Sequence, residues 1–144
     1  MTSTRRAAPH FAPVVPRGTV SYGVGFLAFL PLPIVSMLIG AIAMIALYPH
    51  QRRRGGLASE NGRHAANWGL TVLSAMFVLG AGFAAVLIAT GSTSRIAPLL
   101  STLGYVVLSV VHVSVLVFGV FRTISGRIFE NPLAIPFIRT QSLY

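Results

Sequence analysis

Three long stretches without a charged residue dominate the pattern of apolar and polar positions along this chain. They run from Tyr22 to Leu47, from Trp68 to Thr90 and from Leu99 to Phe121. A helix needs about 20 predominantly apolar residues to cross the hydrocarbon core of a bilayer, and each stretch exceeds that length. The pattern therefore predicts an all-α integral membrane protein with three transmembrane helices.

The first stretch is interrupted by Pro31 and Pro33. Proline lacks an amide hydrogen and clashes with the preceding turn, so it kinks or breaks a helix. Ile34–Leu47 alone covers only about 21 Å at 1.5 Å per residue, short of the roughly 30 Å core. We therefore expect the segment before the prolines to complete one Pro-kinked crossing. A re-entrant hairpin that dips into the bilayer and returns is the alternative.

Local signals set the expected bounds of the other two helices. Asn67 is a good N-cap and Trp68 favours the headgroup boundary, so the second helix is expected to enter the membrane there. About 20 residues between the first and second stretches then form a basic loop. A short polar turn before Pro98 predicts that the second and third helices form an antiparallel hairpin.

The segments outside the stretches are too short to bury a core of their own. Residues 1–21 contain three prolines and three arginines, which predicts an extended tail. Residues 22–138 form the three-helix transmembrane domain, and residues 139–144 form the C-terminal end. The segment after the third helix is interrupted by Pro132 and Pro136 and is too short to cross. We expect it to lie along the membrane interface or to pack under the helices.

The composition agrees with a membrane protein and excludes several kinds of chemistry. Apolar residues make up 54% of the chain and charged residues only 9%, far below a typical soluble domain. The absence of cysteine excludes disulfides, thiolate metal sites and cysteine nucleophiles. The net charge of +9 lies outside the apolar stretches, and no folded basic surface presents it, so no nucleic-acid partner is expected.

Few residues are candidates for chemistry. His112 lies in the middle of the third stretch, where an ionisable side chain must face a cavity or a partner. Its structural interpretation is an interhelical hydrogen bond, for instance to Thr71 or Ser74; a proton or substrate path and a metal or haem ligand are the alternatives. Glu60 and Glu130 are the only acids, and nearby arginines are their expected partners. We therefore expect no enzymatic activity, no bound metal and no cofactor.

Arginine supplies all of the positive side chains and indicates both orientation and partners. Arg52, Arg53 and Arg54 follow the first stretch, where they can set the topology or bind anionic phospholipids. Three crossings place the two ends on opposite sides. The side with more arginines is then cytoplasmic, which puts the C-terminus in the cytoplasm and the N-terminus outside. The use of arginine without lysine is typical of a GC-rich bacterium, and we expect a multi-pass protein of the bacterial plasma membrane.

Small residues recur at four-residue spacing in two of the predicted helices. Ser36-x-x-x-Gly40 and Gly80-x-x-x-Ala84 allow helix backbones to approach closely, either within this chain or between copies.

Two short segments carry a family resemblance. The stretch Arg63–Trp68 leads into an apolar run through Asn and an aromatic residue, and Gly126–Ile135 contains Gly, an aromatic and Pro-Leu. With the Pro31-Leu32-Pro33 break, these motifs resemble a family of small bacterial membrane proteins of unknown function related to the twenty-kilodalton translocon component of the chloroplast inner envelope. The resemblance covers residues 22–138 and implies a compact helical membrane unit without catalytic residues.

These observations predict a non-catalytic accessory or stabilising subunit of a larger bacterial membrane complex in transport, respiration or envelope biogenesis. Larger membrane subunits and anionic phospholipids are its expected partners. A component of a homo-oligomeric translocation or conducting assembly is the alternative. The structural and interaction candidates are Pro31, Pro33, Arg52, Arg53, Arg54, Asn67, Trp68, His112, Gly126 and Pro132.

Overall fold

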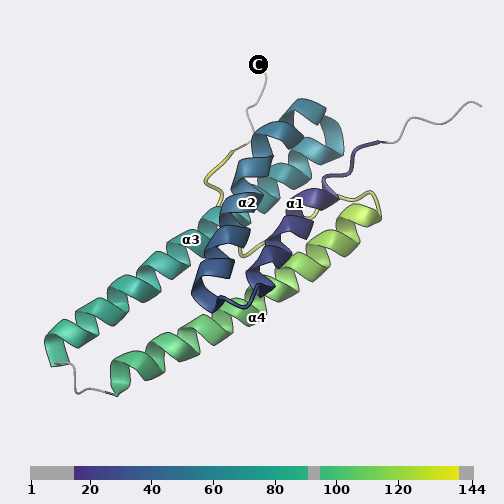
Figure 1. Ribbon diagram of the computed structural model, residues 1–144. Coiled ribbons are helices and arrows are strands. Elements are labelled where there is room, and N and C mark those ends of the chain that lie inside the picture. Colours follow the sequence, from purple (N-terminus) through teal and green to yellow (C-terminus); the bar gives the residue numbers. More distant parts are fainter. Residues whose placement is uncertain (1–14, 91–94, 140–144) are drawn as a thin grey trace, which may run out of the picture.

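Helices form all of the regular secondary structure in the computed structural model, which describes residues 15–90 and 95–139 (Figure 1). A short helix α1 continues into a 3₁₀-helix, η1, and three long helices follow. The elements are α1 (Thr19–Gly23), η1 (Val24–Phe29), α2 (Pro33–Arg54), α3 (Gly56–Thr90) and α4 (Ile96–Ile124). Helices α2, α3 and α4 are each long and apolar enough to cross a membrane, so the all-α class with three such helices is confirmed.

The N-terminal elements form a hairpin in which α1 and η1 run antiparallel to α2. The hydroxyl of Ser36 on α2 donates to the carbonyl of Ala28 on η1 over 2.8 Å. One turn further along α2, a Cβ added at Gly40 would lie 2.8 Å from the carbonyl oxygen of Gly25. The Ser36-x-x-x-Gly40 motif is therefore used inside this chain, where it lets two backbones touch.

The course of the first apolar stretch differs from the single kinked crossing that the sequence predicted. Leu30 has an extended ψ of 149°, and α2 begins at Pro33 after a turn. Proline is well suited to the first turn of a helix, where its missing amide hydrogen has no helical partner. The two prolines thus end one helix and start another, and the close approach at Gly25 and Gly40 folds the first back along the second. The structure therefore has a helical hairpin in place of a single kinked helix.

A sharp turn at Gly55, with φ of 67°, separates α2 from α3, so the predicted basic loop is wrong. Helix α2 extends through Arg54, and α3 already begins at Gly56. The predicted N-cap at Asn67 is also wrong, because Asn67 lies well inside α3. The first turns of α3 are helical because a row of small buried residues packs against α2; a Cβ added at Gly62 would lie 2.7 Å from Cβ of Gln51.

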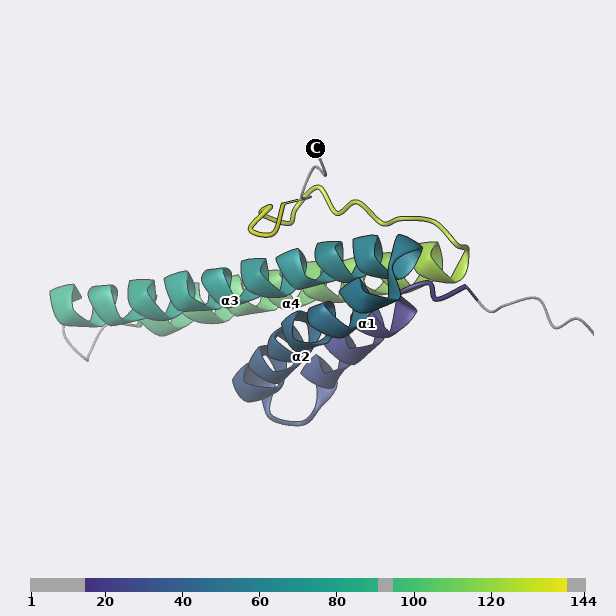
Figure 2. The same cartoon turned by 90° about the horizontal axis from the view of Figure 1, so that it is seen from above.

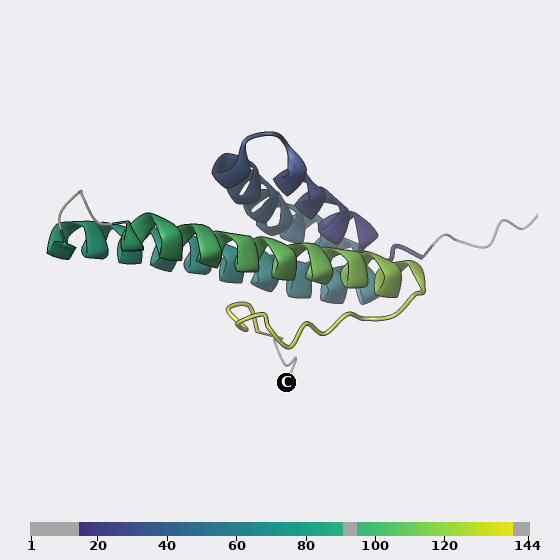
Figure 3. The ribbon, with the colours of Figure 1, turned by 90° about the horizontal axis from the view of Figure 1, so that it is seen from below.

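Helices α3 and α4 form the expected antiparallel hairpin (Figure 1). At 1.5 Å per residue their 35 and 29 residues extend about 52 Å and 44 Å, more than the bilayer core. Figures 2 and 3 show that the α1–α2 hairpin leans away from the α3–α4 pair and covers only part of its length. The outer parts of α3 and α4 therefore leave large apolar side chains exposed, such as Phe77 and Ile88 at 77% and 85%.

The core lies where the two hairpins meet. Tyr22 of α1 packs against the backbone of Gly119 on α4, where any Cβ would collide with its ring. A Cβ added at Gly69 on α3 would lie 2.7 Å from the carbonyl of Ala41 on α2. The buried core residues are Tyr22, Met37, Ala41, Met44, Ala65, Trp68, Val72, Val115 and Leu116.

The start of the described chain and the end of α4 lie at the same end of the molecule, which we call the base. A guanidinium N–H of Arg17 donates to the carbonyl of Ile124, the last residue of α4. The two segments meet because the N-terminal hairpin folds back along itself, and the placement of the two ends on opposite sides of the membrane stays a prediction. Of the described arginines, Arg95 lies at the far tip, and the others lie at the base or in the half of the molecule next to it: Arg17, Arg52, Arg53, Arg54, Arg63, Arg122, Arg127 and Arg139.

Candidate functional site

Three polar side chains on α3 hold the chain segment that follows α4, and we call Asn61, Asn67 and Thr71 the clamp. Figures 2 and 3 show this segment returning alongside α3 without regular secondary structure. Its backbone amides and carbonyls need partners, since they have none from a helix or sheet. The clamp residues supply several of these partners from one helix.

Asn61 joins three parts of the chain. Its Nδ2 donates to the carbonyls of Arg17 at 2.8 Å and Arg127 at 3.2 Å. Its Oδ1 accepts the backbone N–H of Phe129 over 2.9 Å. The amide is fully buried, and these bonds use both of its donors and its acceptor. Asn61 therefore fixes both the N-terminal segment and the C-terminal segment to α3.

Asn67 and Thr71 hold the C-terminal segment further along α3. Asn67 Oδ1 accepts the N–H of Ile138 over 2.7 Å, and its Nδ2 donates to the Ile138 carbonyl over 3.1 Å. The hydroxyl of Thr71 accepts the N–H of Ile135 over 2.9 Å while donating to the carbonyl of Asn67 over 2.8 Å. The candidate Asn67 thus has a binding role within the chain rather than the capping role that its position suggested.

The turn out of α4 aims the C-terminal segment at the clamp. Gly126 has φ of 69°, the left-handed conformation that glycine adopts at little cost. Its N–H donates to Thr123 and the N–H of Arg127 donates to Arg122, both over 3.0 Å. This bond pair is the Schellman motif, which ends helices at glycine. Gly126 is therefore the residue that reverses the chain.

Two further contacts hold the segment along its path. The Phe129 ring meets the Tyr22 ring edge to face at a centroid distance of 5.6 Å. Pro132 lies at the second position of a turn in which Ala134 N–H donates to the Asn131 carbonyl over 3.2 Å. Proline fits that turn position because its ring fixes φ. Pro132 is exposed, and its role is to shape the turn.

Trp68 and His112 form a buried polar pair between α3 and α4, and Trp68 directly follows the clamp residue Asn67. The indole N–H of Trp68 donates to Nδ1 of His112 over 3.0 Å, and the two rings stack with an interplanar angle of 19°. The interhelical hydrogen bond expected of His112 is present, but its partner is Trp68 rather than Thr71 or Ser74. His112 Nε2 is buried, and no hydrogen-bond partner for it is found among the described residues, although the backbone of Gly25 lies close to the ring.

The remaining candidates lie apart from the clamp. Arg52, Arg53 and Arg54 are exposed at the end of α2. Pro31 and Pro33 lie at the opposite end of the N-terminal hairpin. Glu60 pairs with Arg63 over 2.7 Å, as expected from their proximity in sequence. Within the described ranges, no three side chains of His, Asp or Glu gather closely enough to hold a metal ion.

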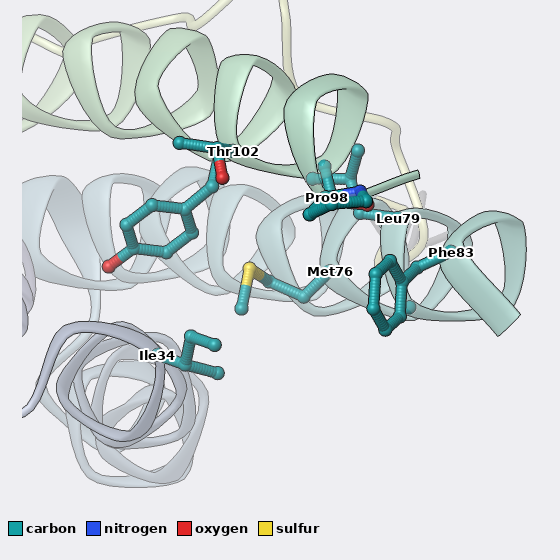
Figure 4. A pocket seen from close by; sticks show the side chains of 9 residues that line it. Ile34, Met76, Leu79, Phe83, Pro98 and Thr102 are labelled. Carbon is teal, nitrogen blue, oxygen red and sulfur yellow. The ribbon is translucent and has the colours of Figure 1, made fainter. Parts of the chain in front are cut away.

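An apolar groove lies away from the clamp, between the outer parts of α3 and α4 and the start of α2 (Figure 4). Its volume is about 480 Å³. Gly80 lines it, and a Cβ added at Gly80 would meet no atom within 4 Å. The Gly80-x-x-x-Ala84 motif is therefore not used for packing within the described chain. The side chains labelled in Figure 4 are Ile34, Met76, Leu79, Phe83, Pro98 and Thr102.

The sequence did not single out Asn61, and it named Thr71 only as a possible partner of His112. Asn61 lies among the small buried residues Ala58, Gly62 and Ala65, so a polar side chain in an otherwise small, apolar helix face was the available signal. That signal points to a buried partner but does not name one.

All of these elements fall within one family match. Residues 18–138 match the model of the magnetosome magnetite crystal formation protein family, and this range contains every helix, the clamp and nearly all of the C-terminal segment. The chain belongs to the magnetosome magnetite crystal formation protein family. No curated protein and no solved structure matches it.

The match corrects the family resemblance drawn from short motifs. The chain is a member of this magnetosome family, not of the family related to the chloroplast inner-envelope translocon component. The misleading motifs include Asn67, Gly126 and the Pro31–Pro33 break, all of which have structural roles in this fold. Residues with such packing and turn-forming roles can occur in unrelated helical membrane proteins. They are therefore poor evidence for membership of a particular family.

Proposed function

We propose that the protein is a non-catalytic accessory component of the magnetosome membrane that supports the formation of magnetite crystals. The observation that carries this proposal is the family match over residues 18–138, which includes the whole helical unit. The magnetosome membrane named by the family replaces, in this proposal, the bacterial plasma membrane that composition suggested. The protein then acts by positioning partners in that membrane rather than by a reaction of its own.

The outer parts of α3 and α4 are the proposed contact surface for larger membrane subunits. Their exposed apolar side chains need lipid or protein around them, and Gly80 and Ala84 are exposed together on α3. Small residues at this spacing allow a helix backbone to approach closely, which is how membrane helices associate without a hydrophobic driving force.

The base is the proposed cytoplasmic side. Apart from Arg95, the described arginines lie at this end or in the half of the molecule next to it, and arginine is enriched in cytoplasmic segments of membrane proteins. Both ends of the described chain then face the cytoplasm, and the tip at Arg95 faces the magnetosome interior.

Deletion of the gene in a magnetosome-forming bacterium tests the function. Electron microscopy should show crystals of altered size or shape inside membranes that still form, and the wild-type gene should restore them. Unchanged crystals after deletion contradict the proposal.

The contact surface has its own matched test. Replacing Gly80 and Ala84 with leucine fills space that is open at Gly80, so the helices should still fold while partner contact is lost. The control is Val78→Leu, at a position of the same helix that is 67% exposed. Restoration of normal crystals by both variants argues against this face as the contact surface.

We do not propose the alternative function, a component of a homo-oligomeric translocation or conducting assembly. It depended on the translocon resemblance, which the family match overturns, and on His112 facing a path between copies. His112 is only 1% exposed and is paired with Trp68 inside the chain.

A further inference from the structure

A basic pocket lies at the base, between the segment that leads into α1 and the end of α2. Residues 15–20 form one wall, Gln51 and Arg54 form the other, and the volume is about 590 Å³. Arg17 and Arg54 both line this pocket, and neither glutamate does. The pocket is therefore suited to an anion.

Arg17 is held in place by the fold. One of its N–H groups donates to the carbonyl of Ile124 at the end of α4. A guanidinium carries five N–H donors in a rigid fork, so this bond orients the group and leaves donors for a ligand. Guanidinium groups match the geometry of phosphate and carboxylate oxygens, and beside a bilayer the phosphate of a lipid headgroup is the anion at hand.

Gln51 supplies an unusual third group. Its side chain is 1% exposed, and its Oε1 is buried without a hydrogen-bond partner among the described residues. A buried acceptor without a donor is unfavourable, and most native structures avoid it. Gln51 lines the pocket, so a rotation of its side chain would bring Oε1 to a ligand with a hydroxyl group beside its phosphate.

An apolar groove continues from the pocket along α1 and η1. Val20 lines both cavities, and the groove has a volume of about 640 Å³. The groove runs along Val24, Leu27 and Leu30 toward the turn between η1 and α2. Every residue that lines it is apolar or glycine, so it suits a hydrocarbon chain and not a polar solute.

We propose that the pocket and the groove together bind one anionic phospholipid with a hydroxyl-bearing headgroup, of the phosphatidylglycerol class. Arg17 and Arg54 hold the phosphate, a headgroup hydroxyl donates to Gln51 Oε1, and an acyl chain lies along η1. The charge of the pocket and its continuity with the groove select this ligand over a free phosphate, which would leave the groove empty. The site goes beyond the proposed function and does not depend on it.

The test measures lipid retained by the purified full-length chain. The protein is reconstituted into nanodiscs of phosphatidylglycerol and phosphatidylcholine, and bound lipids are counted by native mass spectrometry. The wild-type chain should retain one phosphatidylglycerol in preference to phosphatidylcholine, whose headgroup has no hydroxyl donor. Arg54→Gln should lower that retention about fivefold, the change expected for one cation at a membrane surface.

Arg53→Gln is the matched control, because Arg53 is adjacent and also exposed but does not line the pocket. Equal losses in Arg53→Gln and Arg54→Gln show diffuse attraction to the surface and overturn the site. Gln51→Leu removes the buried acceptor, so it should leave the thermal stability unchanged or raised while lowering phosphatidylglycerol retention. Retention unchanged in Gln51→Leu overturns the role of the hydroxyl.

Two soluble probes distinguish a lipid from a free phosphate. Inorganic phosphate and glycerophosphoglycerol, added at millimolar concentration, should fail to displace the retained lipid, because they cannot fill the groove. Displacement by either probe shows a small-anion site and overturns the phospholipid assignment.

Discussion

Trp68 and His112 lie on facing helices with their rings stacked at a centroid distance of 6.1 Å, and the indole N–H donates to the imidazole over 3.0 Å. Both side chains are almost completely buried, at 2% and 1% exposure. The pair therefore joins the base halves of α3 and α4 by a polar contact in an otherwise apolar core. Removing either side chain leaves the other without its partner.

The first prediction concerns this pair. Trp68→Phe and His112→Leu should each lower the free energy of unfolding in detergent by about 1–3 kcal/mol, because each leaves a buried polar atom unpaired. The double variant should be less destabilised than the sum of the two single variants, since it removes both polar groups. Unfolding curves of the four proteins give this coupling, and strict additivity contradicts it.

The second prediction concerns the clamp. Asn67→Ala removes two hydrogen bonds to Ile138 and should weaken the docking of the C-terminal segment by about 2 kcal/mol. Hydrogen exchange of the backbone N–H of Ile138 should then accelerate roughly 30-fold. Ser109→Ala is the control, because the Ser109 hydroxyl bonds only to its own helix, at Tyr105. Similar exchange in both variants shows that the segment is held by other contacts.

The third prediction separates two glycines in similar motifs. Gly40→Ala should destabilise the protein by about 1–3 kcal/mol, because its Cβ meets the backbone of η1 and forces the hairpin apart. Gly80→Ala should be neutral or stabilising, since open space surrounds that position and alanine favours helix. Thermal unfolding in detergent compares the two, and equal effects contradict the hairpin packing.

The fourth prediction concerns topology. The sequence contains no cysteine, so single cysteines at Val15, Arg95 and Arg127 can be labelled without background. In sealed vesicles, a membrane-impermeant maleimide should reach Val15→Cys and Arg127→Cys from the same side and Arg95→Cys from the other. Labelling of Val15→Cys and Arg127→Cys from opposite sides restores the single kinked crossing and rules out the hairpin.

The sequence predicted the long helices well because their signal is local. An uncharged apolar stretch longer than a bilayer core is visible without knowing any contact. The prolines also marked a break correctly. The sequence could not show, however, whether the prolines kink one helix or end it and start another. That outcome depends on the tertiary contact between Gly25 and Gly40.

The site was predicted less well because its partners are distant along the chain. Asn67 resembled an N-cap, since its real partner, Ile138, lies 71 residues away. His112 was singled out correctly as a buried polar residue, but Trp68 was interpreted only as a membrane-interface anchor. In each case the residue type indicated a polar interaction, and only the fold identified the partner.

The clamp also constrains the order in which the chain can fold. Asn61 and Asn67 lie early in α3, yet most of the backbone groups that satisfy them belong to residues 127–138, which follow α4 in the chain. A nascent chain that lacks this stretch leaves the side-chain amide of Asn67 without its Ile138 partners, and Asn61 then keeps only its bond to Arg17. The docking of residues 127–138 onto α3 is therefore a late step of folding, because it has to wait until α4 has been synthesised.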